Sequence, residues 1–145
     1  MITGSIQLRP RYGEVDQMGY VYHANHVTYC HQARTELLRK LGICDHMLEA
    51  NKIMLPVINF HIHYKNPAKY DDLLTIKTTI KDLPKVRFHF EFEITNGKGD
   101  LICMANSTVV FVDSKSRSPK VVPEFVAKVL KNHFNRHPHE TKSTY

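Results

Sequence analysis

The chain has 145 residues, of which 42% are hydrophobic and 23% are charged, which is the composition of one globular domain. A domain of this length buries about two-thirds of the surface of its unfolded chain, so it needs neither disulfides nor a structural metal to be stable. The three cysteines are odd in number and form no CxxC pair, which argues against a disulfide framework or a zinc ribbon and favours a reducing compartment.

The net charge of +6 is compatible with a phosphate-bearing partner such as a coenzyme, or with nucleic acid. The basic residues are spread along the chain and do not gather in one helix or arm, so we expect no nucleic-acid binding. The N-terminus lacks an apolar segment before a small-residue cleavage site, and no apolar run is long enough to cross a bilayer. We therefore expect a soluble, cytoplasmic protein without membrane insertion.

A strand and a long helix are predicted in the first third of the chain. Ile6 to Glu14 reads as an extended segment, in which Pro10 would be tolerated only at a sheet edge or a strand end. From Val27 to Leu41 apolar residues recur at steps of three and four, and Gly42 follows where a left-handed residue would end a helix. A helix of about sixteen residues spans roughly 24 Å, so it can cross a sheet of several strands.

Four further strands are predicted after a connector at 44–52. In the clearest of them apolar and polar residues alternate strictly, which indicates a sheet with one buried face. Turn residues at 82–85 and 96–99 join the last three strands into two hairpins. The predicted strands are Val57–Tyr64, Leu74–Ile80, Val86–Ile94 and Leu101–Val112.

A short amphipathic helix, Val122 to Leu130, is predicted to pack on the outside, and the polar segment from Lys131 onward is expected to be frayed. There is no internal repeat, so we expect a single domain over 1–145. A long helix between the first and second strands, followed by an antiparallel meander, requires the sheet to wrap around that helix. The predicted fold class is therefore α+β, with the five-stranded arrangement known as the hotdog fold.

Asp16 is the most suggestive polar residue, because it stands in the loop entering the helix, three residues before Gly19. Such a loop delivers unpaired backbone N–H groups and the positive end of the helix dipole to a ligand. Those donors suit a carbonyl oxygen that gains negative charge during acyl transfer. A thioester carbonyl is electrophilic enough for a carboxylate to act alone, as nucleophile or as general base for water.

The run from Asp16 to Asn25 resembles the signature of the 4-hydroxybenzoyl-CoA thioesterase group, in its branch of short-chain acyl-CoA thioesterases linked to the bacterial Tol-Pal system. Two further segments, 33–42 and 64–74, also match that branch, and the resemblance covers Ile6 to Val112. It implies a hotdog fold, hydrolysis of acyl-CoA without a cofactor, and a homodimer or homotetramer with sheets continuous across the interface. An acyl carrier protein is the less favoured carrier of the acyl group.

The resemblance also implies roles for individual residues. Asp16 becomes the catalytic carboxylate, and His23 becomes catalytic through its backbone N–H, which would polarise the thioester oxygen with help from its side chain. Two positions depart from the family pattern, Tyr20 and His26, and both touch the acyl pocket, which leaves the acyl group open. The predicted substrate-binding residues in this run are Gly19, Tyr20, Val21, Tyr22 and Asn25. By their charge alone, Lys85 and Arg87 are predicted to contact coenzyme A phosphates, as Lys115 and Arg117 could, although such residues are usually just solvated.

Other interpretations of these residues stay open. Asp16 could simply cap the helix or a turn. His23, His26 and His31 could lie near one helix face, but they do not form an HExxH motif and only one carboxylate is near, so we expect no metal. His61 and His63 alternate on one strand face and are expected to face solvent or line a groove.

Two other functions are compatible with the same fold, because fold alone does not determine function. The protein could bind an acyl group without hydrolysing it, or serve as a scaffold. A dehydratase-like activity ranks last, because the carboxylate precedes the helix and does not lie within it.

Overall fold

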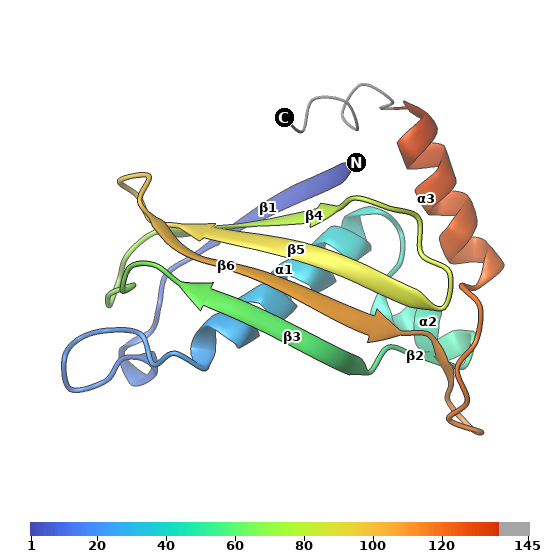
Figure 1. Ribbon diagram of the computed structural model, residues 1–145, viewed down its shortest axis with the longest axis horizontal. Coiled ribbons are helices and arrows are strands. Elements are labelled where there is room, and N and C mark those ends of the chain that lie inside the picture. The colour runs from blue at the N-terminus through green and yellow to red at the C-terminus, as the bar shows by residue number, and fades with distance from the viewer. Residues whose placement is uncertain (137–145) are drawn as a thin grey trace.

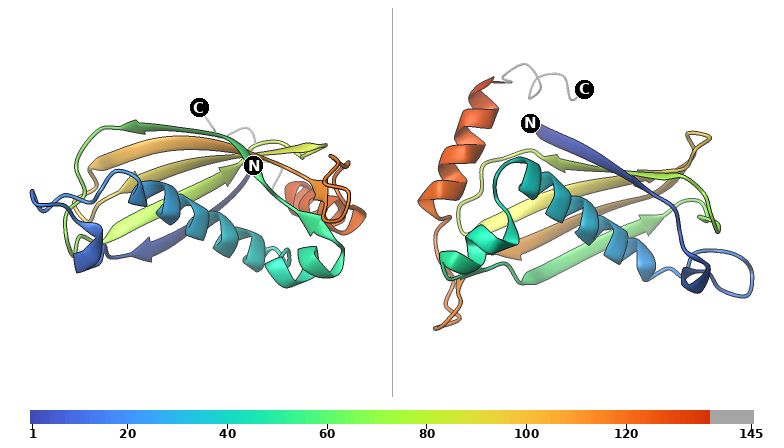
Figure 2. Two further views of the ribbon diagram at one scale, coloured as in Figure 1. Left: turned by 90° about the horizontal axis from the view of Figure 1, so that it is seen from below. Right: turned by 180° about the vertical axis from the view of Figure 1, so that it is seen from behind.

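The computed structural model describes residues 1–136, in which a five-stranded antiparallel sheet curves around the long helix α1 (Asn25–Lys40) (Figure 1). The strand order is β1-β4-β5-β6-β3. α1 lies against one face of the sheet (Figure 2). This confirms the predicted hotdog fold. The strands of the sheet are β1 (Ile2–Leu8), β3 (Val57–Tyr64), β4 (Leu74–Ile80), β5 (Arg87–Thr95) and β6 (Leu101–Val110).

α1 packs on the sheet through one apolar stripe, which includes Cys30, Ala33 and Leu37, all nearly fully buried. Gly42 follows with a φ of +86°, the left-handed conformation that ends the helix. The helix begins two residues before the predicted start, and Val27 is exposed, so it does not belong to the apolar stripe.

The period-two pattern of the strands is confirmed. Phe88, Phe90 and Phe92 are buried on the helix side of β5, and the polar residues between them are exposed. Stacking of Phe90 on Phe92, with ring centroids 6.4 Å apart, continues the packing along the strand. Both predicted hairpins form, since β5 pairs antiparallel with β4 and with β6.

The predicted bounds of the first strand, Ile6–Glu14, are wrong. The strand is Ile2–Leu8, Pro10 lies beyond its end, and Tyr12–Glu14 forms the 3-10 turn η1. Pro10 cannot donate to the ladder, so pairing with β4 stops at Leu8.

The predicted connector at 44–52 contains the short helix α2 (Asp45–Ala50), followed by β2 (Ile53–Met54). β2 pairs with β7 (Val112–Asp113), the detached end of the strand predicted over Leu101–Val112. Leu48 is the buried residue of α2, and six residues are too few to show helical periodicity in the sequence.

The C-terminal helix α3 runs from Glu124 to Arg136, so it is longer than the predicted Val122–Leu130 and lies beside one end of the sheet (Figure 1). Val126 and Leu130 are its buried residues. The prediction of a frayed segment from Lys131 is wrong for 131–136, and the rest of that segment, 137–145, lies outside the described residues. No helix within 1–136 has the length and apolarity needed to span a membrane.

Candidate active site

The loop from Asp16 to Tyr20 is closed by its own hydrogen bonds. The Asp16 N–H donates to the Tyr20 carbonyl (2.8 Å), and Gly19, with a φ of +79°, donates to the Asp16 carbonyl (3.0 Å). Oδ1 of Asp16 accepts from the N–H groups of Met18 (2.8 Å) and Tyr20 (3.2 Å). Asp16 therefore does stabilise a turn, but with one oxygen, and Oδ2 has no hydrogen bond to any residue within 1–136.

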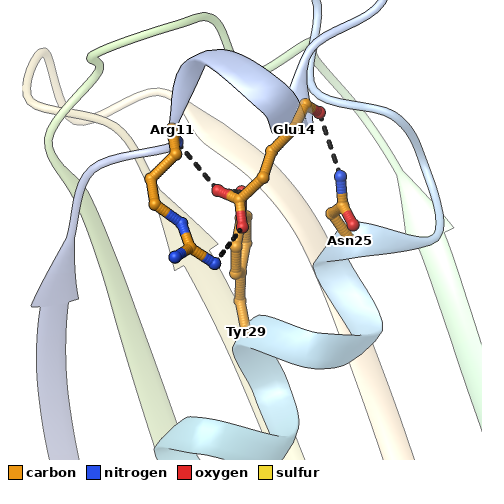
Figure 3. Close-up of polar contacts among 4 residues, drawn as sticks. All are labelled: Arg11, Glu14, Asn25 and Tyr29. Atoms are coloured by element: carbon orange, nitrogen blue, oxygen red, sulfur yellow. Dashed lines mark hydrogen bonds and ion pairs between the residues drawn. The ribbon is translucent and has the colours of Figure 1, made fainter.

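Glu14 ties this loop to α1 (Figure 3). Its carboxylate accepts from the Arg11 N–H (2.8 Å), the Arg11 guanidinium (3.3 Å) and the Tyr29 hydroxyl (2.9 Å). Its carbonyl accepts from the Asn25 amide and from the Tyr22 N–H, each at 2.9 Å. Burial alone would raise the pKa of Glu14, but the hydrogen bonds and the Arg11 charge outweigh it and lower that pKa below 4.5.

The start of α1 presents unpaired donors. The Asn25 N–H bonds to the Tyr22 carbonyl (2.9 Å), whereas in the part of the chain that the structure describes the N–H groups of His23 and Ala24 have no partner. No side chain caps the helix, and its first turn carries no acidic residue. The positive end of the helix dipole is therefore available to an oxygen of a ligand.

A surface pocket of about 500 Å³ lies where the loop, the start of α1 and the end of β3 meet. It brings Asp16 and His23 together, with three of the predicted substrate-binding residues: Tyr20, Val21 and Tyr22. Of the remaining lining residues, His26 was expected at the acyl pocket from the family resemblance, whereas the other four, which lie in the segment 64–74, had no predicted role. These remaining residues are His26, Tyr64, Lys65, Asn66 and Pro67.

The other predicted substrate-binding residues do not line this pocket. Gly19 shapes the turn, and the Asn25 amide is bonded to Glu14. Lys85 and Arg87 lie at the opposite end of the sheet, since Arg87 pairs with Val110 on β6. Tyr64, which lines the pocket, pairs with Cys103 on β6. Cys103 and Val110 are seven residues apart on β6, and seven residues of strand span about 23 Å.

His26 and Tyr64 meet beneath the start of α1. Tyr64 donates its hydroxyl to the His23 carbonyl (2.6 Å), and Nδ1 of His26 lies 3.0 Å from the same oxygen. The two rings are edge to face, with centroids 5.1 Å apart. Burial lowers the pKa of His26, so its ring is neutral at neutral pH.

His31, the third histidine of the metal hypothesis, lies elsewhere. Its Nδ1 is 3.1 Å from the guanidinium of Arg34, which stacks over Phe90. Over residues 1–136, no three His, Cys, Asp or Glu side chains are arranged as metal ligands. His61 and His63 are exposed on β3.

A sheet wrapped around one helix defines the class of hotdog proteins, and here a carboxylate and free amide donors lie at the start of that helix. The sequence profile of the Thioesterase-like superfamily matches residues 10–130, and the chain belongs to this superfamily. The predicted class of enzyme, a thioester hydrolase, is thus confirmed at the level of the family.

Individual relatives agree with this assignment. YneP of Bacillus subtilis is 34% identical over 113 residues, which cover 78% of this chain and 82% of YneP. The acyl-CoA thioester hydrolase YbgC of Escherichia coli is 32% identical over 124 residues, which cover 86% of this chain and 92% of YbgC. The DHNA-CoA thioesterase of Staphylococcus aureus has a similar structure, with a TM-score of 0.84 and 26% identity over 95% of this chain and 96% of the other.

Proposed function

We propose that the protein hydrolyses acyl-CoA to a free carboxylic acid and CoA, with Asp16 as nucleophile or general base. The observation that carries this proposal is one pocket lined by both Asp16 and His23, in which the Asp16 Oδ2 and the His23 N–H have no hydrogen-bond partner among residues 1–136. An acyl-CoA substrate also agrees with the name of YbgC.

The geometry supports a simple sequence of steps. The thioester oxygen accepts from the His23 N–H, and the acyl carbon faces Asp16. Oδ2 either attacks that carbon or takes a proton from an attacking water, and the negative charge that develops on the oxygen is stabilised by the amide donor and the helix dipole. The C–S bond then breaks. In the general-base route the proton taken from water passes from Asp16 to the departing thiolate, which gives the free acid and the thiol directly. In the nucleophile route the thiolate takes a proton from solvent, and water then hydrolyses the acyl-aspartyl anhydride to the free acid and the Asp16 carboxylate. Neither route uses a cofactor.

Narrower assignments belong to the same proposal. The runs at 16–25 and 64–74 support membership of the 4-hydroxybenzoyl-CoA thioesterase group and its Tol-Pal-associated branch, with CoA favoured over an acyl carrier protein. The three cysteines are free thiols, which supports the cytoplasm as the location of the protein: Cys30, Cys44 and Cys103. We also propose that the chain forms one domain.

We further propose that the chain forms a homodimer or homotetramer through β3. β3 is an edge strand of the sheet, and it exposes Val57, Ile58 and Tyr64 beside the polar residues Asn59, His61 and His63. The other edge strand, β1, exposes Thr3, Ser5 and other polar residues. An unpaired edge strand with exposed apolar side chains is typical of a surface that pairs with another chain.

Replacing Asp16 by asparagine tests the mechanism. Asparagine keeps an Oδ1 acceptor for the two loop N–H groups, so it removes the charge of Oδ2 without opening the turn. With a panel of acyl-CoAs and a thiol-reactive dye, we expect Asp16→Asn to lower kcat by at least ~10²-fold. Asp82→Asn, an exposed aspartate after β4, is the matched control and should be as active as the wild type.

Two results would contradict the proposal. Wild-type hydrolysis by a folded Asp16→Asn protein would exclude the role of the carboxylate. No hydrolysis of any acyl-CoA by the wild type, together with saturable acyl-CoA binding, would indicate a non-catalytic binding protein or scaffold.

A further inference from the structure

We propose that Tyr64 and His26 are positioning residues, which hold the carbonyl of His23 and so fix the peptide that carries the Ala24 N–H, next to the His23 N–H at the start of α1. This inference rests on the proposed function, because it assumes that the Ala24 N–H binds the thioester oxygen together with the His23 N–H. Neither side chain needs to touch the reacting atoms.

Three donors converge on the His23 carbonyl. They are the Tyr64 hydroxyl from β3 (2.6 Å), Nδ1 of His26 (3.0 Å) and the backbone N–H of His26 (3.3 Å). Since a carbonyl oxygen can only accept, Nδ1 must carry the hydrogen, and Nε2 of the neutral ring is then an acceptor.

The orientation of His26 has a cost in stability. Its side chain is only 3% exposed, and Nε2 is buried without a hydrogen-bond partner among the residues that the structure describes. A buried acceptor without a partner destabilises the fold, and an apolar ring at this position would avoid that penalty. An apolar ring, however, could not make the hydrogen bond from Nδ1 to the His23 carbonyl.

Two consecutive peptide planes are held here, one by Tyr64 and His26 and the other by a backbone hydrogen bond. The peptide between His23 and Ala24 is trans, so its N–H points away from the carbonyl that Tyr64 and His26 hold. The preceding peptide, which carries the His23 N–H, is held separately, because the Tyr22 carbonyl accepts from the Asn25 N–H (2.9 Å).

The N–H groups of His23 and Ala24 are therefore held in place before a substrate binds. Donors that are already aligned need no reorganisation when charge develops on the thioester oxygen. Hydrogen bonds to a carbonyl also polarise the N–H of the same peptide, so the Ala24 N–H becomes a stronger donor.

Replacing Tyr64 by phenylalanine removes only the hydroxyl. We expect Tyr64→Phe to lower kcat about tenfold and to change KM by less than about twofold, since the donors matter most as charge develops in the transition state. Tyr70→Phe makes the same change at an exposed tyrosine outside the pocket, and it should leave both constants unchanged.

A double substitution tests whether both residues act on one group. His26→Phe should also lower kcat, and the double variant should lose less than the product of the two single losses, because both side chains act on the same carbonyl. Independent, multiplicative losses would contradict a shared role. His26→Phe also tests the proposal if Tyr64→Phe does not fold.

A spectroscopic measurement separates positioning from a structural role. The Asp16→Asn variant should hold an intact acyl-CoA, and the infrared stretch of a ¹³C-labelled thioester carbonyl reports how strongly the donors polarise it. In that background Tyr64→Phe should reduce the downshift of the stretch, and Tyr70→Phe should not.

The outcomes distinguish the two proposals. If the wild type hydrolyses acyl-CoA and Asp16→Asn does not, but folded Tyr64→Phe keeps both kcat and the carbonyl stretch, only the positioning role is wrong. If the wild type hydrolyses no acyl-CoA, both proposals are wrong.

Discussion

Glu14 connects the candidate active-site loop to the helix that supplies the amide donors. One carboxylate oxygen accepts from both Arg11 and Tyr29, and the carbonyl of the same residue accepts from Asn25 (Figure 3). Hydrogen bonds to a charged, partly buried group are stronger than those between neutral groups. We therefore expect the hydrogen bonds of the Glu14 side chain to stabilise the loop measurably.

Glu14→Gln should reduce the free energy of unfolding by about 1 kcal/mol at neutral pH. The folded-state pKa of Glu14 is lowered, so its ionised form adds stability above the unfolded-state pKa, and this contribution is lost as the pH falls through the lowered folded-state pKa. The difference from the wild type in urea unfolding should therefore be largest near pH 7 and shrink below a pH of 4.5. Glu93→Gln, at an exposed position on β5, is the control. A difference that stays constant with pH would contradict this assignment.

The pocket could be predicted from the sequence only in part. Asp16 and His23 belong to one contiguous signature, so their proximity follows from the loop and helix alone. Tyr64 reaches the same pocket from β3, 41 residues away from His23, and only the sheet register places it there. Lys85 and Arg87 were assigned by charge, and charge does not reveal at which end of a strand a residue lies.

At the scale of elements, β1 and α1 approach closely at Gly4. A Cβ atom built on Gly4 would lie 2.7 Å from Cδ1 of Leu37, which is 4% exposed and has little room to move. The absence of a side chain at this position lets the helix lie directly on the strand.

Gly4→Val should therefore lower the free energy of unfolding by about 1–3 kcal/mol, because the new methyl groups overpack the contact with Leu37. Ser5→Val is the matched control, since it places the same side chain at the next, exposed position of β1, and it should leave stability nearly unchanged. Thermal unfolding of both variants measures the effect. Equal melting temperatures would show that α1 shifts to accommodate the valine.

The elements that were predicted correctly are those with long periodic patterns. The alternation around Phe90 and the helical spacing around Ala33 each extend over nine residues or more. A pattern of that length shows which side chains are buried, and the period of the buried positions distinguishes a strand from a helix. β1 was misplaced because its alternation is mostly polar, and α2 was missed because it is short. The end of α3 was missed because residues 131–136 carry few apolar side chains.

At the scale of the whole molecule, the two edges of the sheet differ in chemistry. β1 presents hydroxyl and amide side chains, whereas Val57 and Ile58 at the start of β3 are about half exposed, at 49% and 51%. Met104, on the neighbouring strand β6, adds a further exposed apolar side chain at 49%. The β3 edge is therefore the surface that we expect to be covered by a second copy of the chain.

Ile58→Lys should weaken this association, because the dimer would have to bury an unpaired ammonium group among apolar side chains. We expect the dimer dissociation constant, measured by analytical ultracentrifugation, to rise at least about tenfold, which corresponds to ~1.4 kcal/mol. Val121→Lys makes a comparable change at a position that is 68% exposed and away from the edge, and it should leave the constant unchanged. A wild-type protein that sediments as a monomer at micromolar concentration, or an Ile58→Lys protein that associates as tightly as the wild type, would exclude β3 as the interface.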